Sequence, residues 1–257
     1  MYENKTVPDK IESVIELKAL LLILSCSILF GIYLLISENA ETISNIIYFI
    51  CPLSVSIGSI LLARLYWDSE IFYRSYIALG IGFSMWVAGE VTGHIYQTTQ
   101  IEELKFVIKI FYLSFFPFAI YHIQKNIRYF CSYKISKIKI IGLILFPMII
   151  SFYFYFDVSG AKDENLYDIF NSLTIFMSII IVELSALGIY ILRKNILKST
   201  WQIITMGLLL NAIADIWYLY EVQILLNNFE LIHVYNVFWV TSFMLIIYAL
   251  IKHQKVL

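Results

Sequence analysis

The amino-acid sequence predicts an all-α membrane protein with eight transmembrane helices. Of the 257 residues, 60% are apolar and only 14% are charged. A soluble domain has about 45–50% apolar and about 25% charged residues, so a soluble fold could not bury this excess of apolar side chains. The 19 Phe and 19 Tyr residues argue against a disordered chain. The apolar runs are continuous rather than alternating, which favours helices over the strands of an outer-membrane barrel.

Eight apolar segments are long enough, or nearly so, to cross a bilayer core of roughly 30 Å, which takes about 20 helical residues. The first follows a lead of mixed charge and precedes no small-x-small cleavage site, so we interpret it as a retained helix rather than a signal peptide. Pro52, Pro117 and Pro147 fall inside segments and predict kinks. The predicted segments are 18–36, 43–66, 74–97, 104–123, 138–156, 169–192, 200–221 and 232–252.

The distribution of basic residues predicts the orientation. With the N-terminus placed in the cytoplasm, 15 of the 18 Lys and Arg residues fall in cytoplasmic segments, and the exceptions are Lys105, Lys109 and Lys162. This is a strong positive-inside signal, so we expect both termini in the cytoplasm and one integral domain in the cell membrane. The basic cluster at 125–139 is interpreted as a topology determinant. The lipid bilayer is an expected partner, and nucleic acid is not.

An internal repeat is predicted from a shift of about 125 residues. Residues 82–90 then align with 207–215, and two further residues in a loop bring 111–114 onto 238–241. Four spans per repeat would insert in the same orientation, related by a pseudo-two-fold axis along the membrane normal, with a site between the halves. Chance similarity among apolar helices is the alternative. The predicted repeats cover about 18–123 and about 138–252.

Three acidic residues lie in the interior of predicted spans, away from the span ends: Glu90, Glu183 and Asp215. A charge at the bilayer centre costs at least about 2.5–3.5 kcal/mol on insertion scales, so such residues normally face a bundle interior or a wet cavity. Glu90 and Asp215 align in the repeat and lie at the same predicted depth, roughly 22 Å from the cytoplasmic start of their helices. Glu183 aligns with Ile57 and therefore has no acidic counterpart.

Polar and aromatic residues around these two acids predict an outward-facing pocket. Trp86, Glu90 and His94 share one helix face, and Asn211, Asp215 and Tyr218 share another. The alternative is that the acids are structural and are capped by Asn211, His94, hydroxyl groups and water. The predicted ligand-binding residues are Glu90, His94, Asn211, Asp215, Tyr218, Asn236 and Trp239.

No metal or other cofactor is expected. Glu90 and His94 could supply two metal ligands and Asp215 or His233 a third, but the four His residues lack zinc-type spacing. His122 and His253 lie near predicted span ends, where we expect interfacial positions. Retinal is not expected, because no lysine lies mid-span to form a Schiff base.

The Gly-x6-(Ala/Gly)-acid pattern at 82–90 and 207–215, followed by Phe-(Tyr/Trp)-(Leu/Val)-(Ser/Thr) at 111–114 and 238–241, resembles the multi-pass sensory modules that precede histidine kinase or diguanylate cyclase domains. The resemblance implies a sensor-like, ligand-binding module. Because the sequence contains no cytoplasmic output domain, such a module would signal through a separate partner.

The same stretches are also similar to bacterial lysoplasmalogenase-type membrane proteins, eight-span enzymes with two acids. That resemblance implies that Glu90 and Asp215 polarise water for lipid hydrolysis, although glutamate replaces the expected aspartate at 90. A secondary transporter is a third possibility that the repeat allows, but the spans lack the Gly/Pro-broken pattern of many transporter sites. A structural subunit is a fourth. A binding module rather than an enzyme is the leading expectation.

Overall fold

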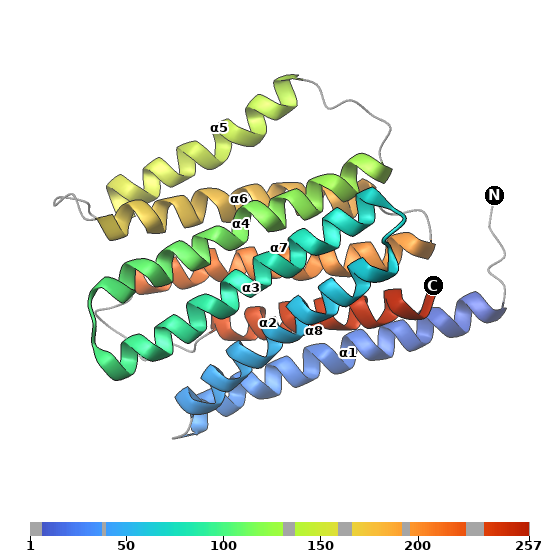
Figure 1. Cartoon of the computed structure of the whole chain (residues 1–257), viewed down its shortest axis with the longest axis horizontal. Coiled ribbons are helices and arrows are strands. Elements are labelled where there is room, and N and C mark those ends of the chain that lie inside the picture. Colours follow the sequence, from blue (N-terminus) through green and yellow to red (C-terminus); the bar gives the residue numbers. More distant parts are fainter. Residues whose placement is uncertain are drawn as a thin grey trace.

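The computed structural model describes residues 7–37, 40–130, 137–158, 166–191, 196–224 and 234–256. Within these ranges the chain forms eight α-helices and one short π-helical segment (Figure 1). Each predicted span overlaps one α-helix, and the fifth also includes part of the π-helical segment. The helices are α1 (Val7–Ile36), α2 (Ala40–Leu65), α3 (Glu70–Thr99), α4 (Glu103–Phe130), α5 (Lys137–Tyr153), α6 (Leu166–Ile191), α7 (Ile196–Ile224) and α8 (Val234–Val256), and the π-helix η1 is Phe154–Val158.

Seven of these helices are long and apolar enough to cross a membrane, so the chain is a multi-pass α-helical membrane protein. The exception is α5, a helix of 17 residues that contains Pro147. Its described apolar stretch, Leu145–Phe156, continues into η1 and is shorter than the other spans. The eighth crossing, the orientation and the repeat therefore stay predictions.

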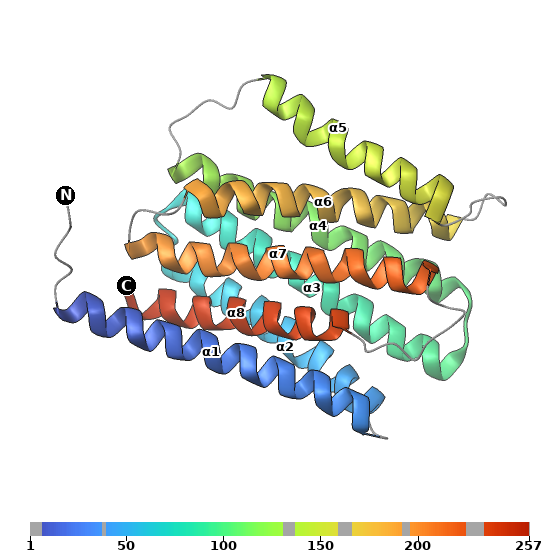
Figure 2. The ribbon, with the colours of Figure 1, turned by 180° about the vertical axis from the view of Figure 1, so that it is seen from behind.

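Six helices form a closed ring, and two lie outside it. Around the ring, α2 packs on α3, α3 on α4, α4 on α6, α6 on α7, α7 on α8, and α8 on α2. Figures 1 and 2 show this ring as two layers, with α2, α3 and α4 in one and α6, α7 and α8 in the other. Outside the ring, α1 packs on α2 and α8, and α5 packs on α6. Because the ring is closed, side chains from all six of its helices can face a common interior.

The apolar side chains divide into those that face the lipid and those that are buried in this interior. Leu22 and Leu29 on α1 are 66% and 64% exposed, as expected for a helix that faces acyl chains. Inside the ring, Phe83, Phe115 and Phe243 are fully buried and pack edge-to-face around Phe83. Aromatic rings from three helices therefore form the centre of the bundle.

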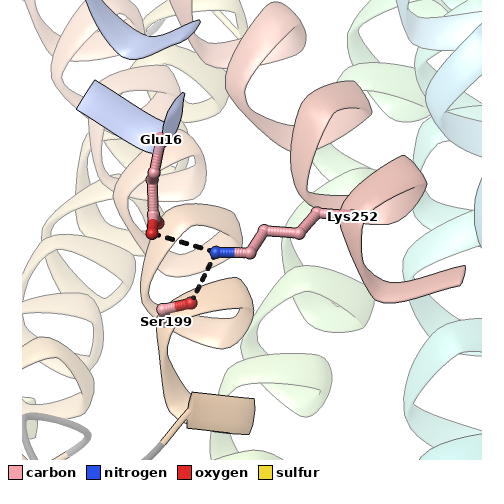
Figure 3. A network of polar contacts seen from close by, with 3 residues as sticks. All are labelled: Glu16, Ser199 and Lys252. Carbon is pink, nitrogen blue, oxygen red and sulfur yellow. Dashed lines mark hydrogen bonds and ion pairs between the residues drawn. The ribbon is translucent and has the colours of Figure 1, made fainter. Parts of the chain in front are cut away.

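One end of the bundle holds the start of α1 and the end of α8 (Figure 1), and we refer to it as the terminal end. Near it, Lys252 of α8 forms an ion pair with Glu16 of α1 at 3.0 Å. The Lys252 ammonium also donates a hydrogen bond to the Ser199 hydroxyl of α7 at 2.9 Å (Figure 3). This contact ties the outer helix α1 to two helices of the ring.

Several residues singled out from the sequence lie outside the described ranges. These include His233 and Lys162.

Candidate functional site

A cavity of about 670 Å³ lies inside the ring, away from the terminal end. Its volume falls in the usual range for small-molecule sites. Glu90 and Asp215 both line it, and each lies nine residues before the last residue of its helix, Thr99 and Ile224. The cavity is lined by Leu34, Ser44, Tyr48, Trp86, Glu90, Lys109, Tyr112, Phe116, Thr174, Asp215, Tyr218, Leu219, Tyr235, Asn236 and Trp239.

Each carboxyl group in the cavity wall accepts a hydrogen bond from an indole. Trp86 Nε1 donates to Glu90 Oε1 at 3.1 Å, one helical turn along α3. Trp239 Nε1 of α8 donates to Asp215 Oδ1 of α7 at 2.9 Å. The Tyr112 side chain of α4 also hydrogen-bonds Glu90. The two acids are thus held in place from several helices.

Asp215 is the more deeply buried of the two acids and the less satisfied. Its side chain is only 6% exposed. Among the described residues, Oδ2 has no hydrogen-bond partner. A buried carboxylate oxygen without a partner is costly, so this atom needs a donor from a ligand or from water.

Aromatic rings form the rest of the wall. The two indoles, Trp86 and Trp239, meet edge to face with centroids 6.0 Å apart. Around Trp239 lie Tyr48, Tyr218 and Tyr235, with centroid distances of 5.7, 5.6 and 5.2 Å. The carboxyl groups therefore sit among polarisable ring faces rather than among aliphatic side chains.

Lys109 is the one basic residue in the cavity wall. Its ammonium donates a hydrogen bond to Asn171 Oδ1 of α6 at 3.1 Å. In the described part of the chain, no ion pair joins Lys109 to Glu90 or Asp215. The positive and negative groups of the wall are thus held apart, each by its own neighbours.

Five of the seven residues predicted from the sequence line this cavity: Glu90, Asp215, Tyr218, Asn236 and Trp239. The structure does not bring His94 or Asn211 to it.

His94 is exposed on α3, because the eighth residue after Trp86 lies about 80° around the helix from it at 3.6 residues per turn. Asn211 is buried (1% exposed) one turn from Asp215 towards the terminal end, and neither amide atom has a partner in the described residues. Neither residue caps Asp215 or Glu90 in this structure.

Sequence reasoning missed several lining residues, chiefly Tyr48, Lys109 and Tyr112. For Tyr112 a signal existed, because the repeat alignment pairs it with Trp239. Lys109 was also visible as one of the few lysines that break the positive-inside pattern. The third acid, Glu183, is half-buried on α6 and does not line the cavity.

A second polar group lies towards the terminal end, and we call it the terminal cluster. His122 Nδ1 lies 2.9 Å from both the hydroxyl and the carbonyl oxygen of Ser75. The hydroxyls of Tyr66 and Tyr76 hydrogen-bond the two ring nitrogens of His253. The members of the terminal cluster are Tyr66, Ser75, Tyr76, His122, Asn126, Trp201 and His253.

The placement of His122 and His253 corrects the sequence expectation. Interfacial positions were expected, yet each is only 1% exposed. The rings of Tyr76 and Trp201 pack against both imidazoles, and this contact buries them inside the bundle.

Within the described ranges, no group of three or more His, Cys, Asp or Glu side chains is close enough to hold a metal ion. In comparisons with known proteins, no family model, curated protein or solved structure matches this chain.

Proposed function

We propose that this protein is a membrane-embedded module that binds a small molecule in the cavity between Glu90 and Asp215. One observation carries the proposal: two intramembrane acids from α3 and α7, each bonded to an indole, line a single hollow. Acids at this depth are costly, and an apolar filling would be more stable for a purely structural bundle. Binding of a ligand would account for both the buried acids and the cavity.

The proposed 4+4 duplication supports a site shared by both halves. With an offset of 125 to 127 residues, four pairs of lining residues become equivalent. The Glu90–Tyr112 hydrogen bond then corresponds to the Asp215–Trp239 bond. The equivalent pairs are Tyr48 and Thr174, Glu90 and Asp215, Lys109 and Asn236, and Tyr112 and Trp239.

Helix packing follows the same two-fold relation. The contact of α4 with α6 corresponds to that of α8 with α2, and these two contacts close the ring. A Cβ added at Gly82 would lie 3.4 Å from the Phe115 carbonyl oxygen, and one at the equivalent Gly207 would lie 3.0 Å from the Ser242 carbonyl oxygen. A cavity on such an axis would receive matched contributions from each half.

The proposed topology places the cavity in the half of the membrane away from the cytoplasm. It is supported by the positive-inside bias of the sequence and by the common end for the start of α1 and the end of α8. A ligand would then enter from outside, and a signalling partner would contact the cytoplasmic end. This sensor-like reading also rests on the resemblance to multi-pass sensory modules.

A membrane-embedded lipid hydrolase is the second candidate, favoured by one observation. The unpartnered Asp215 Oδ2 is an acceptor that could hold and activate a water molecule beside a bound lipid. Turnover of lysolipids by the purified protein, lost in Asp215→Asn, would favour this candidate. Flux into proteoliposomes would instead favour a secondary transporter, the third candidate.

The test of the binding proposal is ligand retention. We expect native mass spectrometry of the purified protein to detect a co-purified small molecule that the Glu90→Gln/Asp215→Asn double variant loses. Glu183→Gln is the matched control, because it neutralises an intramembrane acid outside the cavity. Equal retention in the double variant and the control, or no retained molecule with no thermal shift from any added small molecule, would overturn the proposal.

A further inference from the structure

We propose that the ligand of this cavity is an organic monocation whose ammonium group lies against the Trp86–Trp239 wall, near Asp215. The inference rests on the proposed binding function and adds the chemical class of the ligand. It draws on the charge of the lining, the nature of the rings and the unfilled acceptor on Asp215.

The formal charges of the lining favour a cation. In their ionised forms Glu90 and Asp215 contribute two negative charges and Lys109 one positive charge, which gives the wall a formal charge of −1. Uncompensated charge is expensive where water is scarce, and a bound monocation brings the sum to zero. A bound anion would double the imbalance, and a neutral ligand would leave it in place.

The rings supply the second argument. The wall holds two tryptophans and four tyrosines, and indole is the side chain that binds cations most strongly through its face. Both indole N–H groups already donate to carboxyl oxygens, so the rings are fixed and their faces carry added electron density. Quaternary ammonium groups are recognised by aromatic enclosures of this kind.

Asp215 supplies the third argument. Its Oδ1 is fixed by Trp239, while its Oδ2 has no partner in the described residues. A nearby ammonium group would compensate that oxygen by charge, and a protonated amine would also donate a hydrogen bond to it. The apolar lining residues Leu34, Phe116 and Leu219 suit the hydrocarbon part of such a ligand.

A zwitterion is the closest rival, because its anionic group could use Lys109. The structure favours the monocation, since Lys109 already donates to Asn171 and forms no ion pair with either acid within the described residues. The two ligand classes respond in opposite ways to removal of this lysine. For a monocation, loss of a positive charge from the wall improves binding, whereas for a zwitterion it weakens binding.

The experiment is calorimetric titration of the protein in nanodiscs with three probes of similar shape. The probes are choline, its neutral carbon analogue 3,3-dimethylbutan-1-ol, and the zwitterion glycine betaine. We expect choline to bind at least about tenfold more tightly than either comparison probe, because the neutral analogue lacks the positive charge and the carboxylate of betaine is repelled by the acids of the wall.

Four variants sharpen the result. Asp215→Asn should weaken choline binding by about tenfold or more, and Trp239→Phe should weaken it by roughly threefold to tenfold. Lys109→Met should strengthen choline binding by about threefold. Glu183→Gln should leave it unchanged.

Equal binding of choline and its neutral analogue, or no binding of choline, would overturn the cation assignment. Tighter binding of betaine that Lys109→Met abolishes would replace it with a zwitterion. The proposed function is judged separately, since it survives either result if the purified protein still retains a molecule that the Glu90→Gln/Asp215→Asn variant loses.

Discussion

The cavity and the terminal cluster are built from the same helices with opposite results. From α3 come Glu90 in the cavity and Tyr76 in the cluster, and from α8 come Trp239 and His253 respectively. Both regions combine aromatic rings with polar groups inside a membrane bundle. The cavity has a volume of about 670 Å³, whereas Tyr76, His253 and Trp201 are each 1% exposed or less and in ring contact.

The two regions differ in the charge of their polar groups. In the terminal cluster, neutral donors and acceptors bond one another, as when Asn126 donates to the Ser75 hydroxyl at 3.1 Å, and the one ring nitrogen of His122 without a partner among the described residues belongs to a neutral group. In the cavity, the polar groups are acids and a lysine, and Asp215 Oδ2 has no partner among the described residues. A neutral, mutually bonded cluster stabilises a bundle, while charged groups around a hollow indicate a site kept open for a ligand.

The largest expected effect on the free energy of unfolding comes from removing one buried ring of the terminal cluster. Trp201→Ala removes a buried ring that stacks on Tyr76 at 5.0 Å and contacts His253. We expect a loss of about 3–5 kcal/mol in the free energy of unfolding, because the surrounding helices cannot fill the space. Thermal unfolding in detergent measures it. Trp67→Ala is the control: Trp67 is 70% exposed, and its loss should matter little. Similar losses in both variants would contradict the contrast between a filled and an open region.

Close helix packing gives the next largest effect. A Cβ at Gly207 would lie 2.5 Å from Ile246 Cγ1 and 3.0 Å from the Ser242 carbonyl oxygen. Gly207→Ala should therefore push α7 from α8 and destabilise the fold by about 1–3 kcal/mol.

The matched control for that substitution is Gly93→Ala on α3. No atom lies within 4 Å of the added Cβ there, and alanine has the better helix propensity. We expect Gly93→Ala to leave the thermal midpoint unchanged or to raise it. If Gly207→Ala were equally harmless, the tight contact between α7 and α8 would not be needed for the ring.

The number and position of the helices could be predicted from the sequence, because bilayer thickness fixes the length of an apolar segment. The helical rise predicted that Glu90 and Asp215 lie at matching positions along their helices, and both line the cavity. Tyr48 could not be found this way, since it reaches the cavity only because α2 and α8 close the ring. His94 does not line the cavity, because residues spaced four apart shift around the helix axis with each step, so that the eighth residue after Trp86 no longer shares its face.

The terminal cluster was missed for a related physical reason. Hydropathy marks where a lipid-facing segment ends, but a helix may continue in contact with its neighbours beyond that point. In α4, which continues to Phe130, His122 and Asn126 are buried by contacts with Ser75 of α3, and His122 also by the ring of Trp201 of α7. The closure of a ring and the covering of its end depend on contacts between distant segments, which hydrophobic periodicity does not contain.

The ion pair of α1 offers a smaller test. Lys252 and Glu16 have side chains only 13% and 22% exposed, so Lys252→Met leaves a partly buried carboxylate without its partner. We expect a loss of about 1–2 kcal/mol, between the values for exposed and fully buried pairs. Arg74→Gln serves as the control, because its pair with Glu70 is 57% and 72% exposed. An equal effect of both substitutions on thermal unfolding would count against a structural role for the α1 contact.

The smallest expected effect on stability is at the cavity acids, and it separates the two regions most directly. In the Asp215→Asn variant, the amide oxygen can still accept the hydrogen bond from Trp239 Nε1, while the cavity wall loses one negative charge. We expect the free energy of unfolding to change by less than about 1 kcal/mol, or to rise, because an isosteric neutral group replaces a buried acid. His253→Leu in the terminal cluster, which leaves the hydroxyls of Tyr66 and Tyr76 without their partner, should cost about 1–3 kcal/mol. Thermal unfolding of the ligand-free protein compares the two. A larger loss in Asp215→Asn than in His253→Leu would make the acid a structural element, and the cavity would then lose its strongest argument as a site maintained for binding at the expense of stability.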